Sequence, residues 1–276
     1  MKKFDIITNQ EKDKEQRLGK KIKHYIELKG GRCGIVTEGK DISRETECVF
    51  VLGGDGTLIR AAREISPKDI PCIGVNLGHL GYLCELEEEN VYAAIDQIMK
   101  NEYVIEERMM LMGSSITKRM GKLPGKTALN DIVISRTGAM QLLELIVYIN
   151  GEYLNTFRAD GIIVATPTGS TGYSMSAGGP IVDPKAGMIL ITPINSHNLN
   201  AKSIVVGEKD DIMIEMRSRQ TGKQEKAEVN FDGECSVEFV PGDSISISAA
   251  KSRVKILKLS QISFLEILRK KMQIYS

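Results

Sequence analysis

The sequence predicts an α/β domain followed by a β-rich domain, and two observations support this fold class. Over about the first 105 residues, short apolar segments alternate with segments whose apolar residues recur at helical spacing, which is typical of a parallel sheet with flanking helices. Beyond about residue 106 helical patterns become rare, and strand-like segments follow one another. We therefore expect an α/β domain over residues 1–105 and a β-rich domain over 106–259, with the C-terminal segment 260–276 packing back on the first domain.

Local patterns predict the elements of the first domain. Cys48–Leu52 is apolar throughout, as a strand covered on both faces should be, and Gly30-Gly31 ends the first helix because glycine tolerates the left-handed cap. The expected strands are Phe4–Thr8, Cys33–Val36, Cys48–Leu52 and Pro71–Val75, and the expected helices are Glu11–Lys29, Thr57–Ile65 and Val91–Met99.

The second domain contains one strong hairpin signal. Asn150-Gly151 lies between two strand-like segments, and both turn positions of such a two-residue loop need a positive φ. The expected strands are Ala128–Ser135, Leu142–Ile149, Ile162–Ala165, Met188–Thr192, Ile212–Met216, Ser236–Val240, Ser244–Ser248 and Val254–Leu257. The last segment, Ile262–Met272, has the apolar spacing of a helix.

Composition indicates an ordinary globular protein. Hydrophobic residues make up 42% and charged residues 26%, which argues against disorder. Lysine plus arginine number 37 and aspartate plus glutamate 36, so the net charge of +1 gives no long-range attraction to nucleic acid or an anionic membrane. No apolar run is long enough to span a membrane. The five cysteines form no Cys-x-x-Cys pair and the three histidines are widely spaced. We therefore predict reduced thiols, no protein-ligated metal and a cytoplasmic location.

A glycine loop is the sharpest motif. Val51–Thr57 reads Val-Leu-Gly-Gly-Asp-Gly-Thr, follows an apolar strand and opens a helix. Glycines allow backbone N–H groups to approach phosphate oxygens, and the helix N-terminus adds its positive dipole end. Asp55 conflicts with phosphate binding alone, because two unit charges about 4 Å apart repel by about 4 kcal/mol near a protein surface. Asp55 is expected either to accept a proton from a hydroxyl or to position Mg²⁺ on a nucleotide; an N-cap in a plain turn is the alternative.

A second polar loop runs from Arg158 to Pro180. A predicted strand leads into a segment crowded with Thr, Ser and Gly, whose hydroxyl and amide groups suit sugars and phosphates, and Tyr173 could stack on a base. A Ser/Thr/Gly loop with no ligand is the alternative. Two weaker observations concern the N-terminus: Asn9 could reach a phosphate from the end of the first strand, and the charge run Lys12–Lys21 is expected to be a solvated helix face.

Together, the motifs resemble those of bacterial NAD kinases. They are Gly53–Thr57, Asn76–Leu83, Asn130-Asp131, Ala159–Ser176 and Phe231–Gly233, in that order. The resemblance implies the two-domain fold predicted above and phosphorylation of the adenosine-ribose 2′-hydroxyl of NAD by ATP, giving NADP. It also implies Mg²⁺ or another divalent cation carried with ATP, and a homo-oligomer, either a dimer or a tetramer.

The resemblance also implies roles for individual residues. Asp55 corresponds to the catalytic proton acceptor, Tyr82 to an aromatic contact with adenine, and Asn130 with Asp131 to a pair that grips the ribose hydroxyls. Asp160, with Arg158 nearby, corresponds to a contact at the nicotinamide end. The complete set of expected substrate-binding and cofactor-binding residues is Gly53, Gly54, Gly56, Thr57, Arg60, Asn76, Tyr82, Asn130, Asp131, Arg158, Asp160, Thr168, Gly169, Ser170, Thr171, Gly172, Tyr173, Ser174, Met175, Ser176 and Glu234.

Three departures from the family pattern bear on these roles. Asp131 stands where Glu is commoner, so the ribose contact is one methylene shorter. Gly172 stands where Ala is usual, and Lys202 replaces an arginine, which exchanges a planar fork of donors for a point charge.

Two other functions remain open on the sequence alone. A lipid kinase of the diacylglycerol kinase-like superfamily shares the Gly-Gly-Asp-Gly-Thr motif, but it would need an apolar acceptor groove or a membrane-binding segment. A non-catalytic dinucleotide-binding regulator would tolerate loss of the acidic residue, yet Asp55 is present. The phosphoryl donor, whether ATP, another triphosphate or polyphosphate, is also open.

Overall fold

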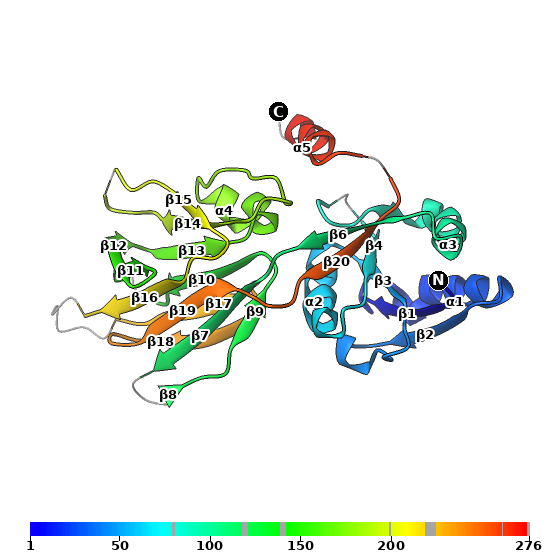
Figure 1. Cartoon of the computed structure of the whole chain (residues 1–276), viewed down its shortest axis with the longest axis horizontal. Helices are drawn as coiled ribbons and strands as arrows, with labels where there is room; N and C mark the ends of the chain where they lie inside the picture. The colour runs from blue at the N-terminus through cyan, green and yellow to red at the C-terminus, as the bar shows by residue number, and fades with distance from the viewer. Residues whose placement is uncertain are drawn as a thin grey trace. The chain divides into compact units, whose positions relative to one another are not determined.

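The chain folds into two compact units. The computed structural model describes residues 1–78, 81–117, 121–138, 142–198, 200–218, 225–260 and 262–274. The first unit comprises Met1–Arg108 and Ser252–Ser276, and the second comprises Met109–Lys251. The first unit therefore contains both ends of the chain, drawn in blue and red in Figure 1. An α/β part followed by a β-rich part is the predicted fold class, which is confirmed.

The first unit is built on a mostly parallel sheet. Its strands run in the order β2-β1-β3-β4-β20-β6, with β5 beside β4, and the antiparallel pair in it is β20 with β6. The strands are β1 (Lys3–Thr8), β2 (Arg32–Val36), β3 (Cys48–Gly53), β4 (Cys72–Asn76), β5 (Leu86–Glu87), β6 (Val104–Arg108) and β20 (Val254–Lys258).

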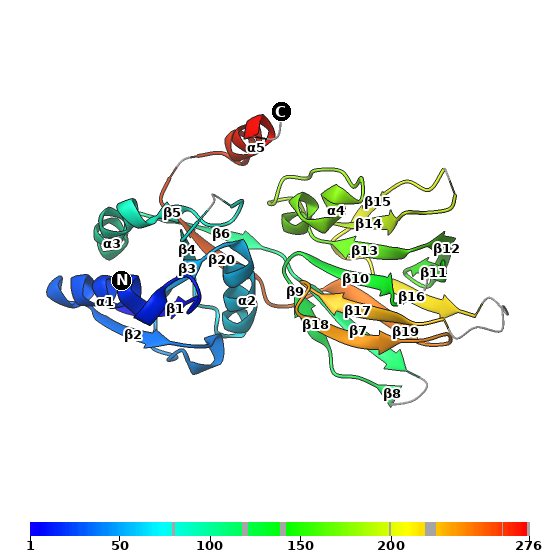
Figure 2. The same ribbon diagram turned by 180° about the vertical axis from the view of Figure 1, so that it is seen from behind.

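Helices cover both faces of this sheet. These are α1 (Arg17–Leu28), α2 (Asp55–Ile65) and α3 (Val91–Met99); the unit also contains α5 (Phe264–Ile274), which follows β20. Ile22 of α1 and Ile95 of α3 share one core with Phe50 of β3. Helix α2 lies on the opposite face, as Figures 1 and 2 show, with Leu58 close to Gly74 of β4. No helix in the described part of the chain is long and apolar enough to cross a membrane.

Helix α1 begins later than the predicted Glu11. Its first residue is Arg17, because Glu15 and Gln16 have positive φ values of 57° and 55°. The buried Asp13 carboxylate accepts the N–H groups of Leu18 at 2.9 Å and Gly19 at 3.1 Å, and so satisfies donors that the first helical turn leaves open. A side chain outside the helix therefore sets its start.

The strand predicted at Val254–Leu257 belongs to the first unit rather than to the β-rich part. It forms β20, which pairs parallel to β4 and antiparallel to β6. The expected placement was wrong because a five-residue strand carries no local signal of its partners. The chain leaves the second unit at Lys251, and β20 then completes the parallel sheet.

The second unit is a sandwich of antiparallel strands. In the described residues one sheet has the order β15-β14-β13-β10-β17-β18 and the other the order β12-β11-β16-β19-β7-β8, with β9 beside β7. The strands are β7 (Leu111–Thr117), β8 (Gly121–Lys122), β9 (Lys126–Ala128), β10 (Asp131–Arg136), β11 (Leu143–Ile149), β12 (Glu152–Ala159), β13 (Gly161–Ala165), β14 (Met188–Ile194), β15 (Ile204–Gly207), β16 (Ile212–Arg217), β17 (Ala227–Phe231), β18 (Cys235–Phe239) and β19 (Ser244–Ala249).

The core of the second unit lies between its sheets. Ile134 and Val229 of one sheet share a buried cluster with Leu145 and Ile214 of the other. The predicted hairpin is confirmed: β11 and β12 are joined by Asn150 and Gly151, with φ values of 53° and 81°.

A polar loop covers the outer face of the β10–β13–β14 region. A smaller apolar cluster there, which includes Ile163 and Leu190, packs against Ala177 and Val182. This packing holds the 3₁₀ turn η5 (Thr168–Thr171) and the short helix α4 (Tyr173–Ser176) beside the sheet, as Figures 1 and 2 show. Most of the residues expected to bind a nucleotide in this unit are therefore placed near the start of β10.

Candidate active site

The glycine loop of the first unit joins β3 to α2. Gly53 ends β3 and Gly54 precedes Asp55, the first residue of α2. A Cβ at Gly53 would lie 2.5 Å from Oγ1 of Thr57, so this position requires glycine. The eleven residues of α2 leave unpaired N–H groups and the positive end of the helix dipole at the loop, which suits an anion.

The Asp55 carboxylate is enclosed by the segment that follows β4. It accepts hydrogen bonds from the backbone N–H groups of Tyr82 at 2.6 Å, Leu83 at 3.2 Å and Cys84 at 3.2 Å. A Cβ at Gly81 would collide with the same carboxylate, so only glycine allows the segment to approach this closely. We call residues 81–84 the clasp.

The Cys84 thiol adds a further donor to Asp55. Burial, together with the negative charge of Asp55 and a hydrogen bond to it, raises the pKa of this thiol, which therefore stays protonated. A carboxylate offers about four acceptor positions. Three N–H groups and one thiol occupy them, so in this arrangement Asp55 holds the clasp in place.

Lys12 is a charged residue whose position in the fold differs from the prediction. It was expected on the solvated face of a helix, but it precedes α1. Its Nζ lies 3.4 Å from the position that a Cβ of Gly54 would occupy, and 3.7 Å from the corresponding position at Gly78. An ammonium group therefore lies beside the glycine loop. It offers the positive charge that a phosphate chain needs.

Four other residues of the first unit that the sequence indicated as candidates occupy different environments. The buried Asn76 donates from Nδ2 to the carbonyl of Gly78 at 2.7 Å, and so shapes the segment after β4. Arg60 is exposed on α2. Tyr82 is half-buried, with Nζ of Lys271 in α5 5.5 Å from its ring centroid. Asn9 donates to Oγ1 of Thr57 at 3.3 Å, which ties the end of β1 to α2. His79 and Leu80, in the Asn76–Leu83 motif, lie outside the described residues.

The second unit has a pocket of about 410 Å³. Such volumes are typical of small-molecule sites. Three predicted residues, Asn130, Asp131 and Tyr173, line it together with residues that the sequence analysis did not select: Val133, Ser135, Asn230, Asp232 and Gly233. Tyr173 is 47% exposed, so its ring is available to a ligand.

Asp232 holds the backbone under this pocket. Its carboxylate accepts the N–H groups of Leu129 at 2.9 Å, Asn130 at 2.7 Å and Asp131 at 3.2 Å. From the other side, the hydroxyl of Thr166 donates to the carbonyl of Leu129 at 2.6 Å. Hydrogen bonds therefore hold the segment from Leu129 to Asp131 both at its backbone N–H groups and at the Leu129 carbonyl.

Asp131 has an unusual proton affinity. Its side chain is 6% exposed. Burial, with a smaller contribution from the negative charge of Asp232, raises the pKa of the Asp131 carboxyl to about 7. This carboxyl therefore changes charge near neutral pH, at the wall of the pocket.

The Thr-Ser-Gly loop divides into structural and accessible residues. Ser170 is buried and exchanges hydrogen bonds with the backbone of Val182, and the buried Ser174 hydroxyl lies 3.3 Å from that of Thr192. Thr168 is buried as well. A Cβ at Gly169 would collide with the carbonyl of Asn130. The side chains of Tyr173, Met175 and Ser176 are exposed, and Thr171 and Gly172 are half-buried.

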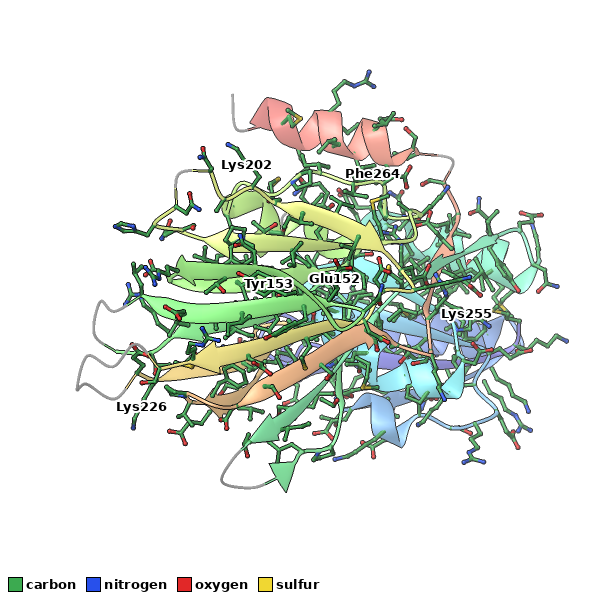
Figure 3. The ribbon with its side chains drawn as sticks, turned by 60° about the vertical axis from the view of Figure 1, so that its left-hand side comes forward. Glu152, Tyr153, Lys202, Lys226, Lys255 and Phe264 are labelled. Carbon is green, nitrogen blue, oxygen red and sulfur yellow. The ribbon has the colours of Figure 1, made fainter. Side chains whose placement is uncertain are left out.

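The predicted nicotinamide-end residues are engaged within the second unit. Asp160 accepts from Nε of Arg136 at 2.6 Å and from Nδ2 of Asn195 at 3.1 Å, and the Arg136 guanidinium lowers the pKa of Asp160. Nε of Arg158 donates to the Glu144 carboxylate at 3.2 Å. Glu234 is exposed on the turn after Asp232. Lys202, labelled in Figure 3, is exposed between β14 and β15.

Comparison with known proteins identifies the family. The model of the ATP-NAD kinase N-terminal domain matches residues 7–103, and that of the ATP-NAD kinase C-terminal domain matches residues 129–259. The chain belongs to the NAD kinase family. The NAD kinase of Agathobacter rectalis is 54% identical over the full length of both chains. The NAD kinase of Lachnospira eligens is 45% identical over 99% of this chain and 100% of its own.

Two solved structures share the fold. Yeast NADH kinase, crystallised with NADH, has a TM-score of 0.86 and 21% identity over 100% of this chain and 88% of its own. An NAD kinase from Archaeoglobus fulgidus, in complex with ATP, has a TM-score of 0.79 and 23% identity over 98% of each chain.

The NAD kinase motifs contain most of the groups described above, but not all. Asp232 lies inside the Phe231–Gly233 motif, which gave a signal of its presence but not of its partners. Lys12 and Arg136 lie outside every motif. Nothing in their local sequence distinguishes them from other surface cations, and only the fold brings them to the glycine loop and to Asp160.

Proposed function

We propose that this protein transfers a phosphoryl group from ATP to the adenosine-ribose 2′-hydroxyl of NAD, giving NADP. The observation that carries the proposal is the full-length match to proteins named NAD kinase, at 54% identity in one relative. Neither a lipid kinase nor a non-catalytic regulator is favoured by these relatives. Asp55, which a regulator would not need, is present at the glycine loop.

The pocket of the second unit is the proposed site for the adenosine half of NAD. Asn130 and Asp131 would bind ribose hydroxyls, and the exposed ring of Tyr173 would stack on the adenine. Oδ1 of Asn130 is buried and has no hydrogen-bond partner among the described residues, which leaves an acceptor for a ligand hydroxyl. The remaining polar loop residues would then act mainly through backbone groups and through the accessible Thr171 to Ser176 segment.

The glycine loop of the first unit is the proposed site for the phosphate chain of ATP. The N-terminus of α2 and the Lys12 ammonium both favour negative charge. No group of three or more His, Cys, Asp or Glu side chains within the described ranges could hold a metal ion. We propose that Mg²⁺ enters with the nucleotide, since this ion is commonly bound by substrate phosphates, water and one or two carboxylates.

The chemical step proposed for Asp55 is general base catalysis. The 2′-hydroxyl oxygen forms a bond to the γ-phosphorus while the bond from that phosphorus to the β,γ-bridging oxygen breaks, so ADP leaves. The hydroxyl proton passes to the Asp55 carboxylate, and such assistance typically contributes about 10²–10⁴-fold. The N–H groups of the clasp donate hydrogen bonds to this carboxylate. For Asp55 to act as the base, the clasp must therefore release at least one of the two carboxylate oxygens.

Two further properties belong to this proposal. The resemblance of the sequence motifs to NAD kinases implies a homo-oligomer, which we propose as a dimer or tetramer. The thiols of Cys33, Cys48, Cys72 and Cys84 are free and buried, which supports the proposed cytoplasmic location.

The direct test is product formation. Purified protein is incubated with NAD, Mg²⁺ and either ATP, another triphosphate or polyphosphate, and NADP is measured with an NADP-specific dehydrogenase. NADP formation that depends on both NAD and the donor is the expected result. Binding of NAD without turnover would favour the regulator, and phosphorylation of a diacylglycerol in a parallel assay would favour the lipid kinase.

A further inference from the structure

A turn of the second unit contains a carboxylate with an unusual set of partners. Asp232 lies between β17 and β18 with a φ of 51°, and Gly233 follows with a φ of 72°. A left-handed conformation at a residue other than glycine costs free energy and persists only where other interactions require it. The three N–H groups that donate to Asp232 are such interactions. They belong to the consecutive residues Leu129, Asn130 and Asp131, which lie 101 to 103 positions earlier in the sequence.

The contact is reciprocal. The N–H of Asp232 donates to the carbonyl of Asp131 at 3.1 Å, while the N–H of Asp131 donates to Oδ1 of Asp232 at 3.2 Å. The turn and the start of β10 are therefore locked together by backbone and side chain. Moving the Asp232 carboxylate would free Asn130 and Asp131 at the same time.

Side-chain oxygens carried by this locked segment have no hydrogen-bond partner within the part of the chain that the structure describes. Oδ1 of Asn130 is buried without a hydrogen bond, and none of the hydrogen bonds among the described residues involves the carboxyl group of Asp131, which is more than nine-tenths buried. Both residues line the pocket. Acceptors at this pocket suit the ribose 3′-hydroxyl, which can donate one hydrogen bond, while the proton of the 2′-hydroxyl is the one that passes to Asp55.

The charges near Asp131 are few. The turn contributes the charge of Asp232 at the pocket and carries Glu234 exposed two residues later; the Tyr173 hydroxyl of α4 is a polar group of the same pocket. On β13, the residue opposite Asp131 is Ala165, and the other polar groups in the pocket, Ser135 and Asn230, are neutral. The negative charge of Asp232 therefore acts on the protonation of Asp131 as well as on its position.

We infer that Asp232 is a positioning residue for the nucleotide ribose, one that orders Asn130 and Asp131 and makes ribose binding depend on pH. This inference rests on the function proposed above. Ionised Asp131 accepts a hydrogen bond from the ribose 3′-hydroxyl, whereas the protonated carboxyl has lost acceptor capacity. The burial and the charge that raise the pKa of Asp131 to about 7 set the pH range in which this change occurs. The KM for NAD therefore falls as the pH rises through neutrality.

The test is the pH profile of the KM for NAD, measured by NADP formation from pH 5.5 to 8.5 at saturating MgATP. Asp232→Asn removes the charge and at least one of the three acceptor contacts, because one carboxylate oxygen becomes an NH₂ group. We expect the KM at pH 8 to rise about tenfold or more. The midpoint of the KM profile moves to lower pH, since Asp131 loses a negative neighbour.

Two further variants separate this role from a purely structural one. Asp210→Asn is the matched control, because Asp210 is also a turn carboxylate that accepts an N–H group, from Gly207 at 2.7 Å, but it does not line the pocket. It should leave both the KM and its midpoint unchanged. Asp131→Asn should abolish the change in KM near neutral pH, and it provides the test if Asp232→Asn does not fold.

The outcomes are distinguishable. An active wild-type enzyme whose KM does not vary between pH 6 and 8 would overturn the inference and leave the proposed function intact. So would a rise in KM in Asp232→Asn with an unmoved midpoint, or a pH dependence that survives in Asp131→Asn. A wild-type protein that forms no NADP would instead overturn the proposed function; isothermal titration of NAD binding against pH would then test the Asp232 role separately.

Discussion

The backbone N–H of Tyr82 donates a 2.6 Å hydrogen bond to Oδ2 of Asp55, the residue proposed as the catalytic carboxylate. With the N–H groups of Leu83 and Cys84, it holds that carboxylate inside the clasp. Asp55 therefore has a structural partner in addition to its proposed chemical role. The two roles make different predictions, because one depends on the negative charge and the other on the approach of the clasp.

Asp55→Asn is expected to lower kcat by about 10²-fold or more, since the proton of the 2′-hydroxyl loses its acceptor. The KM for NAD should change much less. The measurement is steady-state NADP formation, with Glu89→Gln, an exposed change in the same unit, as the control. A kcat close to that of the wild type would show that Asp55 is not the base.

Gly81→Ala is expected to release the clasp while the carboxylate stays. The added Cβ would collide with Asp55, so the N–H groups of residues 82–84 must move away. Hydrogen exchange at these amides should accelerate about tenfold or more, as expected for groups that lose native hydrogen bonds. Gly56→Ala, where a Cβ meets open space, is the exchange control. Unchanged protection in Gly81→Ala would mean that the clasp does not depend on this contact.

Lys12→Ala is expected to raise the KM for ATP about tenfold, because a phosphate chain at the glycine loop would lose a nearby cation. The KM for NAD should stay within about twofold, and Lys12→Arg should keep part of the affinity. Lys20→Ala, an exposed lysine on α1, is the matched control. An equal effect of the Lys12 and Lys20 variants would indicate only a change in general charge.

Asp13→Ala is expected to lower the free energy of unfolding by about 1–2 kcal/mol, in the range of lost helix caps. The Asp13 carboxylate accepts from Leu18, Gly19 and the hydroxyl of Thr8, so its removal leaves buried donors unpaired. Urea unfolding followed by circular dichroism measures the change, with the exposed Glu11→Ala as the control. Equal stability of the two variants would contradict the capping role.

Asp131→Asn is expected to stabilise the protein above neutral pH. The folded chain holds the Asp131 proton more tightly than the unfolded chain, because the pKa rises from 3.8 to about 7 on folding. Ionisation therefore lowers the wild-type free energy of unfolding progressively between about pH 4 and pH 7, by up to about 4 kcal/mol. The variant lacks this loss. Urea unfolding at pH 5 and pH 8 measures the free energy of unfolding of the variant and of the wild type. A stability gain of the variant that is equal at both pH values would show that the ionisation of Asp131 does not affect stability.

Much of the fold and of the candidate site can be read from contiguous residues. Apolar runs such as Cys48–Leu52, the helical period of Val91–Met99 and the Asn150-Gly151 turn are local signals, because the backbone geometry that they favour involves only neighbouring residues. The glycine loop between β3 and α2 is local in the same sense. So is the order of motifs that carried the resemblance to NAD kinases.

Only the tertiary structure decided which groups meet across long sequence separations. It joined Asp55 to the clasp 27 residues away, Asp232 to the N–H of Asn130 102 residues away, and β20 to a sheet formed by the other end of the chain. It also determined the proton affinity of Asp131, which depends on burial and on a charge from a distant turn. Hydrogen bonds and desolvation depend on distance in space, and a linear pattern of residue types does not encode that distance.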